Sequence, residues 1–490
     1  MYKYISTFIA LAIAIATATT CNAQTVTIHP NHIVVQKFMG LGLQWDPYAY
    51  QPSPGCMKII KSRMDFCRPG FLRVMWGADC YCLGFRADGS PEFVWQKGFA
   101  PHREYLNKLY GILDYAQKRD IKVILGVWSP PIGIINNEAD PRWNEITADL
   151  LNYLRRVKGY TCITMYDAIN EPNGSWSGNK DYASWVALVD SLHAEFVKKG
   201  VSSKIYIIGP DTTGSTTWLY PFIWLDSTAH DVSGDIGAFD LHWYASDSEV
   251  YDDEIEQLLI KKRQVLVNDG PSIASRPCFL GECGLLTGQI NIDQQPRVKT
   301  FGYGVMMADY VAQTARAGWM GATAWDLDDA MHPVRDAPTP PGPLTLKMWG
   351  FWNSQGAAMG HPGDFDVRPW FYTWSLMSRL FPRGSRIVET DEPNLPRFRA
   401  IAGTDQVHGS VNLSIMLVNN NYTPNRITIQ SPNISSISLI CYHYFNNDMP
   451  TDTDEMPIPI ASYSHVNLER GFSIDMPSRG VIFLHGTEGK

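Results

Sequence analysis

The chain has 490 residues, of which 45% are hydrophobic and 18% are charged, and its formal net charge is -8. This is a globular composition with enough apolar residues for a large core, which excludes an intrinsically disordered chain. The acidic balance also excludes non-specific binding of nucleic acid, because such binding needs a basic surface that neutralises phosphates.

The N-terminus has the pattern of an export signal. Lys3 supplies the positive end, an apolar run follows, and Cys21-Asn22-Ala23 resembles an A-x-A cleavage site. We therefore expect residues 1–23 to be removed and the mature chain to be secreted or periplasmic. A lipid-anchored Cys21 is the disfavoured alternative, because Thr19-Thr20 makes a poor lipoprotein signal. The apolar run falls short of the roughly 18–20 residues that span a bilayer, and no other stretch predicts a membrane span.

Eight cysteines remain after the signal, and export permits disulfides. A zinc site is disfavoured, because the spacing lacks C-x-x-C pairs and no His pair accompanies them. Cysteines in apolar runs are expected to be buried free thiols, namely Cys162, Cys278 and Cys283. Four others lie close together and could form one or two bridges whose pairing stays open: Cys56, Cys67, Cys80 and Cys82.

From residue 38 to about 375, short apolar strands alternate with amphipathic helices. Strands that are apolar on both faces and alternate with helices indicate a parallel sheet, and eight such units predict a (β/α)8 TIM barrel. An open doubly wound sheet is the alternative, disfavoured because no Gly-rich phosphate fingerprint opens the first unit. The predicted helices are 104–119, 143–157, 182–199, 252–268 and 298–317. The predicted strands are 38–43, 71–76, 123–127, 163–169, 204–208, 238–242, 278–281 and 322–325.

After about residue 380 the pattern becomes that of an all-β sandwich. Short strands are separated by Asn, Pro, Gly and Asp, and no long helical pattern survives. Residues 24–37 contain an alternating segment that we expect to join this sandwich as a strand. The predicted domains are therefore the barrel at 38–380 and the sandwich at 381–490. The predicted sandwich strands are 387–389, 397–402, 413–418, 426–430, 436–444 and 480–484.

Two glutamates stand at the carboxyl ends of predicted strands, where barrels place catalytic groups. Glu171 follows the fourth strand in Asn170-Glu171-Pro172, and Glu282 follows the seventh in Gly281-Glu282-Cys283-Gly284. A capping acid or a surface-loop acid is the structural alternative at each position. Strands four and seven lie across the barrel, so the two carboxylates can face each other over a sugar, as glycoside hydrolysis requires.

The paired motifs Asn170-Glu171-Pro172 and Gly281-Glu282 resemble those of glycoside hydrolase clan A, whose members are retaining (β/α)8 enzymes. The resemblance implies that Glu171 is the general acid/base, that Glu282 is the nucleophile, and that Asn170 bonds the sugar 2-hydroxyl. Glu171 must then hold a proton near neutral pH, and repulsion by an ionised Glu282 would supply this.

Other strand ends extend the resemblance over roughly residues 38–375. Arg73 is similar to the clan's arginine that contacts the nucleophile, and Trp325 to the tryptophan that floors the −1 subsite. His242-Trp243-Tyr244 resembles the His-x-Tyr motif, whose tyrosine bonds the nucleophile. Arg73 and Tyr244 are suitable donors for the charge of Glu282.

The motifs are similar to two different families within the clan. Trp128-Ser129-Pro130-Pro131 after the third strand is similar to family 30, whose members carry a β-sandwich built from both chain ends. Gly281-Glu282-Cys283-Gly284 and the His-x-Tyr motif are more similar to family 5, which usually has a histidine near the position of Trp128. We expect a family 30-like architecture with divergent motifs, and Trp128 as a substrate-binding residue.

Several further residues have two interpretations. Trp45 and Asp46 follow the first strand and either bind sugar hydroxyls or form a structural turn. Acids after Trp325 could attract a hard cation, but we expect solvated loop acids and predict neither a metal nor a cofactor. That acidic loop holds Asp326, Asp328, Asp329 and His332, and a later aromatic loop that either walls a subsite or packs on the sandwich holds Trp349, Phe351 and Trp352.

The sequence thus predicts a secreted retaining β-glycoside hydrolase that cleaves a β-linked poly- or oligosaccharide by double displacement. We expect endo action, because the loops are rich in aromatic residues. We also expect a monomer. An exo-acting enzyme of the same clan is an alternative. A non-catalytic carbohydrate-binding barrel is disfavoured because both carboxylates and their helpers are present, and a metal-dependent hydrolase because no His-rich strand end occurs.

Overall fold

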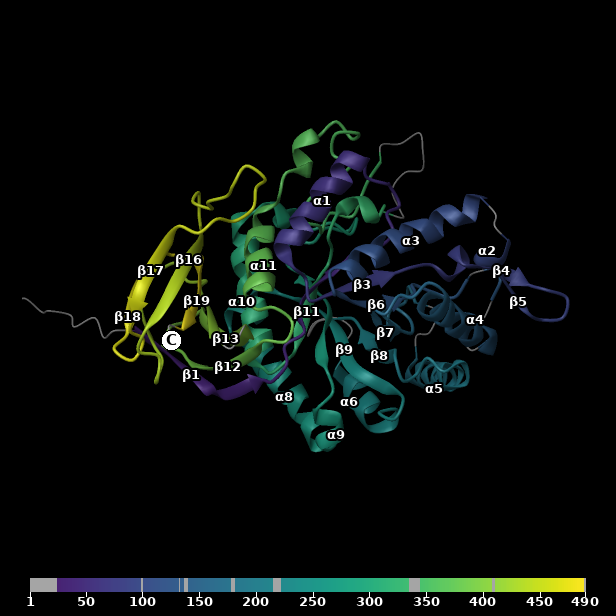
Figure 1. Cartoon of the computed structure of the whole chain (residues 1–490), viewed down its shortest axis with the longest axis horizontal. Helices are drawn as coiled ribbons and strands as arrows, with labels where there is room; N and C mark the ends of the chain where they lie inside the picture. The colour runs from purple at the N-terminus through teal and green to yellow at the C-terminus, as the bar shows by residue number, and fades with distance from the viewer. Residues whose placement is uncertain are drawn as a thin grey trace, which may run out of the picture.

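The computed structural model describes residues 24–97, 100–131, 133–135, 140–177, 181–214, 222–334, 344–407 and 410–488. The predicted signal peptide and Cys21 lie outside these residues. Within them, eight parallel strands form a closed barrel, and a nine-stranded sheet forms a second unit beside it (Figure 1). The predicted fold class, a (β/α)8 barrel with a β-sandwich, is confirmed.

The barrel strands follow one another around the cylinder in chain order, and each is paired in parallel with the next. Each overlaps one of the strands expected from the apolar runs. In order they are β2 (Gly40–Gln44), β3 (Phe71–Met75), β6 (Lys122–Gly126), β7 (Ile163–Asp167), β8 (Tyr206–Thr212), β9 (Ile236–Ala245), β10 (Cys278–Leu285) and β11 (Gly321–Ala324).

Helices follow the strands on the outside of the barrel (Figure 1). Local signals set their ends: α5 begins after Asp181, whose side chain accepts the Ser184 N–H, and stops at Gly200, which has a φ of 68°. The helices are α1 (Pro54–Cys67), α2 (Val94–Lys97), α3 (Ala100–Lys118), α4 (Pro141–Asn152), α5 (Tyr182–Lys199), α6 (Phe222–Asp231), α7 (Asp247–Tyr251), α8 (Glu254–Asn268), α9 (Pro271–Ala274), α10 (Phe301–Arg316) and α11 (Pro369–Leu380).

The five helical ranges named from the sequence overlap α3, α4, α5, α8 and α10, and none of them covers the other helices, α11 among them. Nearly all of α11 is buried, so it lacks the polar face that makes an amphipathic pattern visible. A small hairpin of β4 (Cys82–Phe85) and β5 (Pro91–Phe93) projects from the connection between β3 and α3.

Among the helices of the described ranges, none is both long enough and apolar enough to cross a bilayer.

The inside of the barrel is built in two layers. The apolar layer consists of one side chain from each of six strands: Phe71, Ile124, Met165, Ile208, Ala238 and Phe279. Side chains alternate in direction along a strand, so the residue two positions after three of these members also points inward. Those residues are Arg73, Asp167 and Asp240, all buried. A layer of charged groups therefore lies on an apolar floor, toward the carboxyl ends of the strands.

The sandwich has a hydrophobic core of its own, to which most of its strands contribute. β1, the first strand of the chain, lies inside this sheet between β12, which is antiparallel to it, and β15, which is parallel. The order across the sheet is β17 (Ala461–Val466), β16 (Ile437–Phe445), β19 (Gly480–Glu488), β14 (Ser410–Asn419), β13 (Phe398–Val407), β12 (Arg386–Asp391), β1 (Gln24–Val35), β15 (Asn425–Gln430) and β18 (Phe472–Met476).

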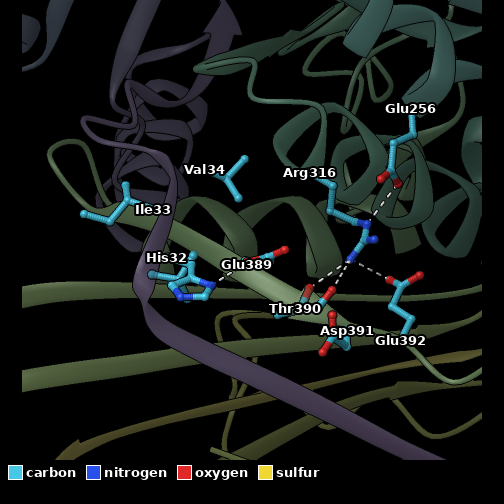
Figure 2. Close-up of a pocket in the computed structure, with 10 residues that line it drawn as sticks. His32, Ile33, Val34, Glu256, Arg316, Glu389, Thr390, Asp391 and Glu392 are labelled. Atoms are coloured by element: carbon cyan, nitrogen blue, oxygen red, sulfur yellow. Dashed lines mark hydrogen bonds and ion pairs between the residues drawn. The ribbon is translucent and has the colours of Figure 1, made fainter.

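Arg316 of α10 joins the barrel to the sandwich at a hollow of about 760 Å³ between the two units (Figure 2). Its guanidinium donates to Glu256 Oε2 at 2.9 Å and to Thr390 Oγ1 at 2.8 Å, and pairs with Glu392 at 3.0 Å. Burial raises the pKa of Glu392 to about 8, although Arg316 opposes the shift. Figure 2 shows Glu256 of α8, Thr390 of β12 and Glu392, which follows β12, converging on the Arg316 guanidinium.

All eight cysteines of the described residues are free thiols, so the suggested bridges are not formed. Cys56 and Cys67 belong to one helix, α1, eleven residues apart. At 1.5 Å per residue this is ~16 Å, far beyond the roughly 7 Å between Cα atoms that a disulfide allows. Burial raises the pKa of Cys67 to about 12 and that of Cys162 to about 11, so both thiols stay protonated.

Candidate active site

Glu282 lies in β10 at the mouth of the barrel and is buried, with 3% of its surface exposed. Its Oε1 accepts a hydrogen bond of 2.6 Å from Arg73 Nη1, and its Oε2 accepts one of 2.6 Å from the Tyr244 hydroxyl. The preceding Gly281 is required by the crowded interior, because a Cβ there would come within 2.7 Å of Asp240 Oδ2. Both oxygens of Glu282 are therefore fixed by donors from other strands.

The electrostatic setting of Glu282 combines opposing effects. Burial raises its pKa, while His242, Arg73 and the Tyr244 hydroxyl favour the ionised form. The net direction is upward from the ordinary value. Burial together with the charge of Glu282 also raises the pKa of Tyr244, so the tyrosine keeps its proton and remains a donor.

Replacing Tyr244 by phenylalanine should move the acid limb of the pH–kcat/KM profile to higher pH. The resemblance implies that Glu282 is a nucleophile, which attacks in its ionised form, so we expect activity to fall as pH drops through its pKa. Loss of a donor to the carboxylate raises that pKa further. We expect kcat/KM at the optimum to fall about 10-fold to 100-fold, as for a lost hydrogen bond to a charge.

Tyr310→Phe is the matched control for this change, because Tyr310 is also buried and donates at 2.7 Å to the Trp243 carbonyl. The control should leave the acid limb in place. An unmoved limb in Tyr244→Phe would mean that Tyr244 does not act on the charge of Glu282.

Glu171 follows β7 and has a left-handed backbone conformation, with a φ of 48°. Such a conformation is strained for a residue with a side chain and persists where surrounding bonds hold it. Here the Glu171 amide donates to Asp211 Oδ2 at 3.3 Å, and the Glu171 carbonyl accepts from Gly174 N at 2.9 Å. Its carboxylate accepts from His242 Nδ1 at 2.9 Å through Oε1 and from Trp176 Nε1 at 2.7 Å through Oε2.

His242 lies between the two glutamates. Its Nδ1 is 2.9 Å from Glu171 Oε1 and 3.4 Å from Glu282 Oε2, while its Nε2 donates to Asp211 Oδ1 at 2.9 Å. Burial would lower the pKa of His242, but Asp211 and Glu282 outweigh it and raise the pKa well above the usual value. The ring is therefore protonated and donates from both nitrogens. We expected His242 to bind substrate, whereas this fully buried side chain contacts Glu171 and Glu282.

Arg73 is the centre of the charged layer. Besides Glu282, its guanidinium donates to Asp167 Oδ2 at 2.9 Å, to Asp211 Oδ2 at 2.9 Å and to Asn170 Oδ1 at 2.8 Å. The arginine is completely buried, so each of these bonds replaces a bond to water. Since the Asn170 carbonyl oxygen faces Arg73, the NH₂ group of Asn170 is the part that can face a sugar hydroxyl.

The three aspartates of this layer differ in charge state. Burial opposes ionisation of all three, but Arg73 and His242 hold the pKa of Asp211 far below its usual range. Burial and the charge of Asp211 raise the pKa of Asp167 and of Asp240 well above that range. Asp211 is thus the most acidic of the three, and its charge favours the protonated form of the other two carboxyls. Arg73 and His242 then balance Asp211 and Glu282.

Asp211→Asn should therefore lower the stability at pH 7, whereas Asp240→Asn should not. Asp211→Asn removes the charge between Arg73 and His242 and should lower the free energy of unfolding by about 3 kcal/mol. Asp240→Asn replaces a neutral carboxyl by a neutral amide and should leave stability unchanged or raise it. Urea unfolding of both variants measures the difference.

The pH dependence gives a second readout for Asp240. Because its pKa is raised in the folded state, the folded chain binds a proton that the unfolded chain releases above its ordinary pKa. Stability contributed by this group therefore falls as pH rises above that ordinary value. The advantage of Asp240→Asn over the natural chain should grow between pH 5 and pH 8, and a constant difference would contradict a neutral Asp240.

An aromatic corner stands beside the glutamates at the ends of β6 and β11. Trp325 stacks on His332 with ring centroids 4.9 Å apart, and Trp128 meets both rings edge-on, at 6.0 Å from Trp325 and 5.8 Å from His332. Lys347 Nζ lies 5.9 Å from the Trp325 ring. The structure thus brings Trp128 and Trp325, which the sequence proposed separately, into one cluster.

Trp45 and Asp46 take structural positions. Trp45 is 1% exposed and packs edge-on against Tyr115 of α3, outside the barrel, so it cannot contact a sugar in this structure. Asp46 is buried, and its Oδ1 accepts from Gln44 Nε2 at 2.8 Å and from Met75 N at 2.6 Å. The strand alternation explains the difference: Gln44 points inward to Arg73, and the next residue points outward.

The acids after Trp325 are buried, whereas the sequence suggested solvated loop acids. Asp329 pairs with Arg368, and Asp328 Oδ1 accepts the Ala330 and Ser354 amides at 3.0 Å each. Burial, followed by neighbouring aspartates, raises the pKa of Asp326 well above its usual range. The nearby aromatic loop is also buried, and it contributes Trp349, Phe351 and Trp352. This region is therefore a folded wall of the site.

Two groups in the described residues bring potential metal ligands within 4.8 Å of one another. One is Glu171, His242 and Glu282, and the other is Asp211, Asp240 and His242. In both groups the ring nitrogens of His242 donate to carboxylates, and in the first Arg73 supplies a positive charge at the position of Glu282. The donor set is that of an ion-pair network, which balances its own charge.

Sequence reasoning missed four groups that touch the glutamates or their partners: Asp167, Trp176, Asp211 and Asp240. A signal existed for Asp167 and Asp240, because a carboxylate inside an apolar strand, in phase with inward residues, is costly unless it serves a site. Trp176 gave no such signal, since its approach to Glu171 depends on the path of the intervening loop.

No known family model matches the chain, and no curated protein sequence matches it. Solved structures do. A GH30 endoxylanase from Clostridium papyrosolvens C71 is 13% identical, with a TM-score of 0.64 over 94% of this chain and 99% of that one. A monomeric β-xylosidase from Caulobacter crescentus CB15 is 12% identical, with a TM-score of 0.61 over 95% and 99%.

An α-L-arabinofuranosidase from Thermotoga maritima is 12% identical, with a TM-score of 0.64 over 95% of this chain and 100% of that chain. These matches cover both chains almost completely, so each compares the barrel and the sandwich together. At such low sequence identity the matches show the fold of the chain. The chain therefore shares its fold, barrel and sandwich together, with GH30 xylanases.

Proposed function

We propose that this protein is a retaining β-glycosidase that hydrolyses a β-linked poly- or oligosaccharide by double displacement. The distance between the two carboxylates carries the proposal: an oxygen of Glu171 and an oxygen of Glu282 lie within 4.8 Å of each other. Retaining glycosidases hold their carboxyl groups about 5–5.5 Å apart, whereas inverting enzymes need about 6.5–9.5 Å to admit a water. The observed spacing supports retention.

In the first step a Glu282 oxygen attacks the anomeric carbon of the bound sugar. The bond from that carbon to the glycosidic oxygen breaks, and the Glu171 proton passes to this oxygen, so that the leaving group departs as an alcohol. The product is an ester between Glu282 and the sugar. Arg73 and Tyr244 hold the attacking carboxylate in place before the step and bond its ester oxygens afterwards.

In the second step water attacks the anomeric carbon of the ester. Glu171, now a carboxylate, takes one proton of the water, and the bond from the sugar to Glu282 breaks. Glu171 gave its proton to the leaving group in the first step, so the same group acts first as acid and then as base. Two inversions at one carbon give a product with the β configuration of the substrate.

The finer features of the proposal are endo action, export and a monomeric state. The fully matched neighbours include enzymes named for endo action, such as the GH30 endoxylanase, and enzymes named as xylosidases. We propose endo action because aromatic side chains gather at the mouth of the barrel, where a polysaccharide needs several contact points. The signal sequence pattern supports secretion or a periplasmic location.

The test is a product profile on β-1,4-xylan, β-1,4-glucan, β-mannan and β-galactan. A mixture of oligosaccharides at early times supports endo action, whereas release of a single small sugar from the start would indicate exo action instead. ¹H NMR of the first product shows whether the β anomer precedes the α anomer. If the α anomer appeared first, the double displacement would be wrong. If none of the four β-glycans were cleaved, the proposed function itself would be wrong.

A further inference from the structure

Trp176 bonds the outer oxygen of the acid/base and is exposed. Its Nε1 donates to Glu171 Oε2 at 2.7 Å, yet 48% of the residue is open to solvent. The other oxygen, Oε1, accepts from His242, whose ring is fully buried and held by Asp211. The two oxygens of Glu171 therefore differ: one faces the interior of the barrel, and the other lies beside an exposed indole.

This difference assigns the oxygen that delivers the proton. A protonated carboxyl has one hydroxyl oxygen and one carbonyl oxygen. A protonated His242 can only donate, so Oε1 must accept and is the carbonyl oxygen. The hydroxyl is then Oε2. A glycosidic oxygen that receives its proton must come within a hydrogen-bond length of about 2.7 Å from Oε2. Since Oε2 is itself 2.7 Å from Trp176 Nε1, the glycosidic oxygen lies within about 5.4 Å of the indole nitrogen. The leaving sugar must therefore pass beside this ring.

The loop is shaped to hold the indole in this position. A Cβ on Gly174 would come within 2.3 Å of Trp176 Cε2 and 2.4 Å of Cζ2, so the ring lies directly on the glycine. Any larger residue at position 174 would push the ring away from Glu171. The Gly174 amide in turn donates to the Glu171 carbonyl at 2.9 Å, which closes the turn that carries both residues.

We propose that Trp176 forms the leaving-group subsite: its N–H orients the proton-donating oxygen of Glu171, and its exposed ring receives the first sugar of the leaving group. The inference rests on the proposed glycosidase function and adds the place where the departing sugar binds. Trp176 acts on the chemistry through Glu171, so it is a positioning residue with respect to proton transfer and a contact residue for the leaving sugar.

The test compares two substrates that share a glycone: xylotriose, whose leaving group is a sugar, and β-xylobiosyl fluoride, whose leaving group is a single atom. Cellotriose and β-cellobiosyl fluoride replace them if the chain cleaves glucan. Trp176→Ala should lower kcat/KM on the trisaccharide about 10-fold to 100-fold, the size of effect that a misplaced catalytic group produces. The fluoride should change by no more than about 3-fold, because it neither fills the subsite nor needs a full proton.

Two further variants separate the parts of the proposal. Trp176→Phe keeps a ring but loses the N–H, so its kcat/KM on the trisaccharide should lie between that of the natural chain and that of Trp176→Ala. Gly174→Ala keeps the tryptophan but displaces it, so it should follow Trp176→Ala. Tyr422→Ala removes an exposed aromatic side chain from the sandwich and should change neither substrate.

Equal losses on both substrates would reduce Trp176 to a structural role and overturn the proposal, as would an unchanged trisaccharide rate. These outcomes differ from failure of the glycosidase function itself, in which the natural chain would hydrolyse neither the trisaccharide nor the fluoride. Should Gly174→Ala not fold, the two Trp176 variants decide the question alone.

Discussion

Replacement of Glu282 by alanine is expected to lower kcat at least about 10⁴-fold on every glycoside, as for loss of a nucleophile that forms a covalent intermediate. The side chain is buried, and Arg73 and Tyr244 each bond one of its oxygens. Glu171 cannot substitute, because it is held by His242 and Trp176 on the other side of the gap.

Azide identifies the lost group as the nucleophile. In Glu282→Ala a small anion can enter the vacated position and attack an activated 2,4-dinitrophenyl β-glycoside from the α face. The expected product is the α-glycosyl azide, and a β-glycosyl azide would assign Glu282 as the acid/base instead. Glu389→Ala, at the hollow between the two units, is a control that should keep full activity.

Replacement of Glu171 by alanine is expected to have the second largest effect, and one that depends on the leaving group. On a glycan, whose leaving oxygen needs a proton, kcat/KM should fall about 10²-fold to 10⁴-fold, the range of general acid catalysis. On a 2,4-dinitrophenyl β-glycoside the first step needs no proton, so the ester on Glu282 should form and then accumulate, because its hydrolysis lacks a base. A burst of dinitrophenolate followed by slow turnover is the measurement.

Azide again distinguishes the roles. It attacks the accumulated ester from the β face and should restore turnover of Glu171→Ala as the β-glycosyl azide. An equal loss on glycan and dinitrophenyl substrates, without a burst, would mean that Glu171 is not the proton donor. Since Glu171 is strained and bonded to Asp211, thermal unfolding should accompany the kinetics, and we expect the variant to fold.

The sequence predicted the barrel because its signal is repeated eight times. Strands buried on both faces leave uniformly apolar runs, and each one that was expected overlaps a strand of the closed barrel. α11 escaped prediction because nearly all of it is buried, so it has no polar face. Hydrophobic periodicity reports contact with water, so it is silent where an element is covered on all sides.

The site was predictable where the candidate residues lie in or directly after the barrel strands. Arg73 and Tyr244, in β3 and β9, both bond Glu282 of β10, and Glu171 follows β7. Of the two interpretations of Trp45, its burial against Tyr115 favours the structural one, because a shift of one residue reverses the direction of a side chain. Trp176 could not be foreseen, since its bond to Glu171 depends on the way the loop folds back over Gly174.

The place of β1 in the sheet determines the order in which the molecule can be completed. β1 is the first described strand to leave the ribosome, but both of its neighbours, β12 and β15, are synthesised only after the entire barrel. The nascent chain therefore carries a strand with two open edges through most of its synthesis, and such edges are templates for wrong pairing. The barrel can close early, while β1 gains its two neighbours only after the barrel has been made, so strands of the C-terminal unit cover the edges of the first strand.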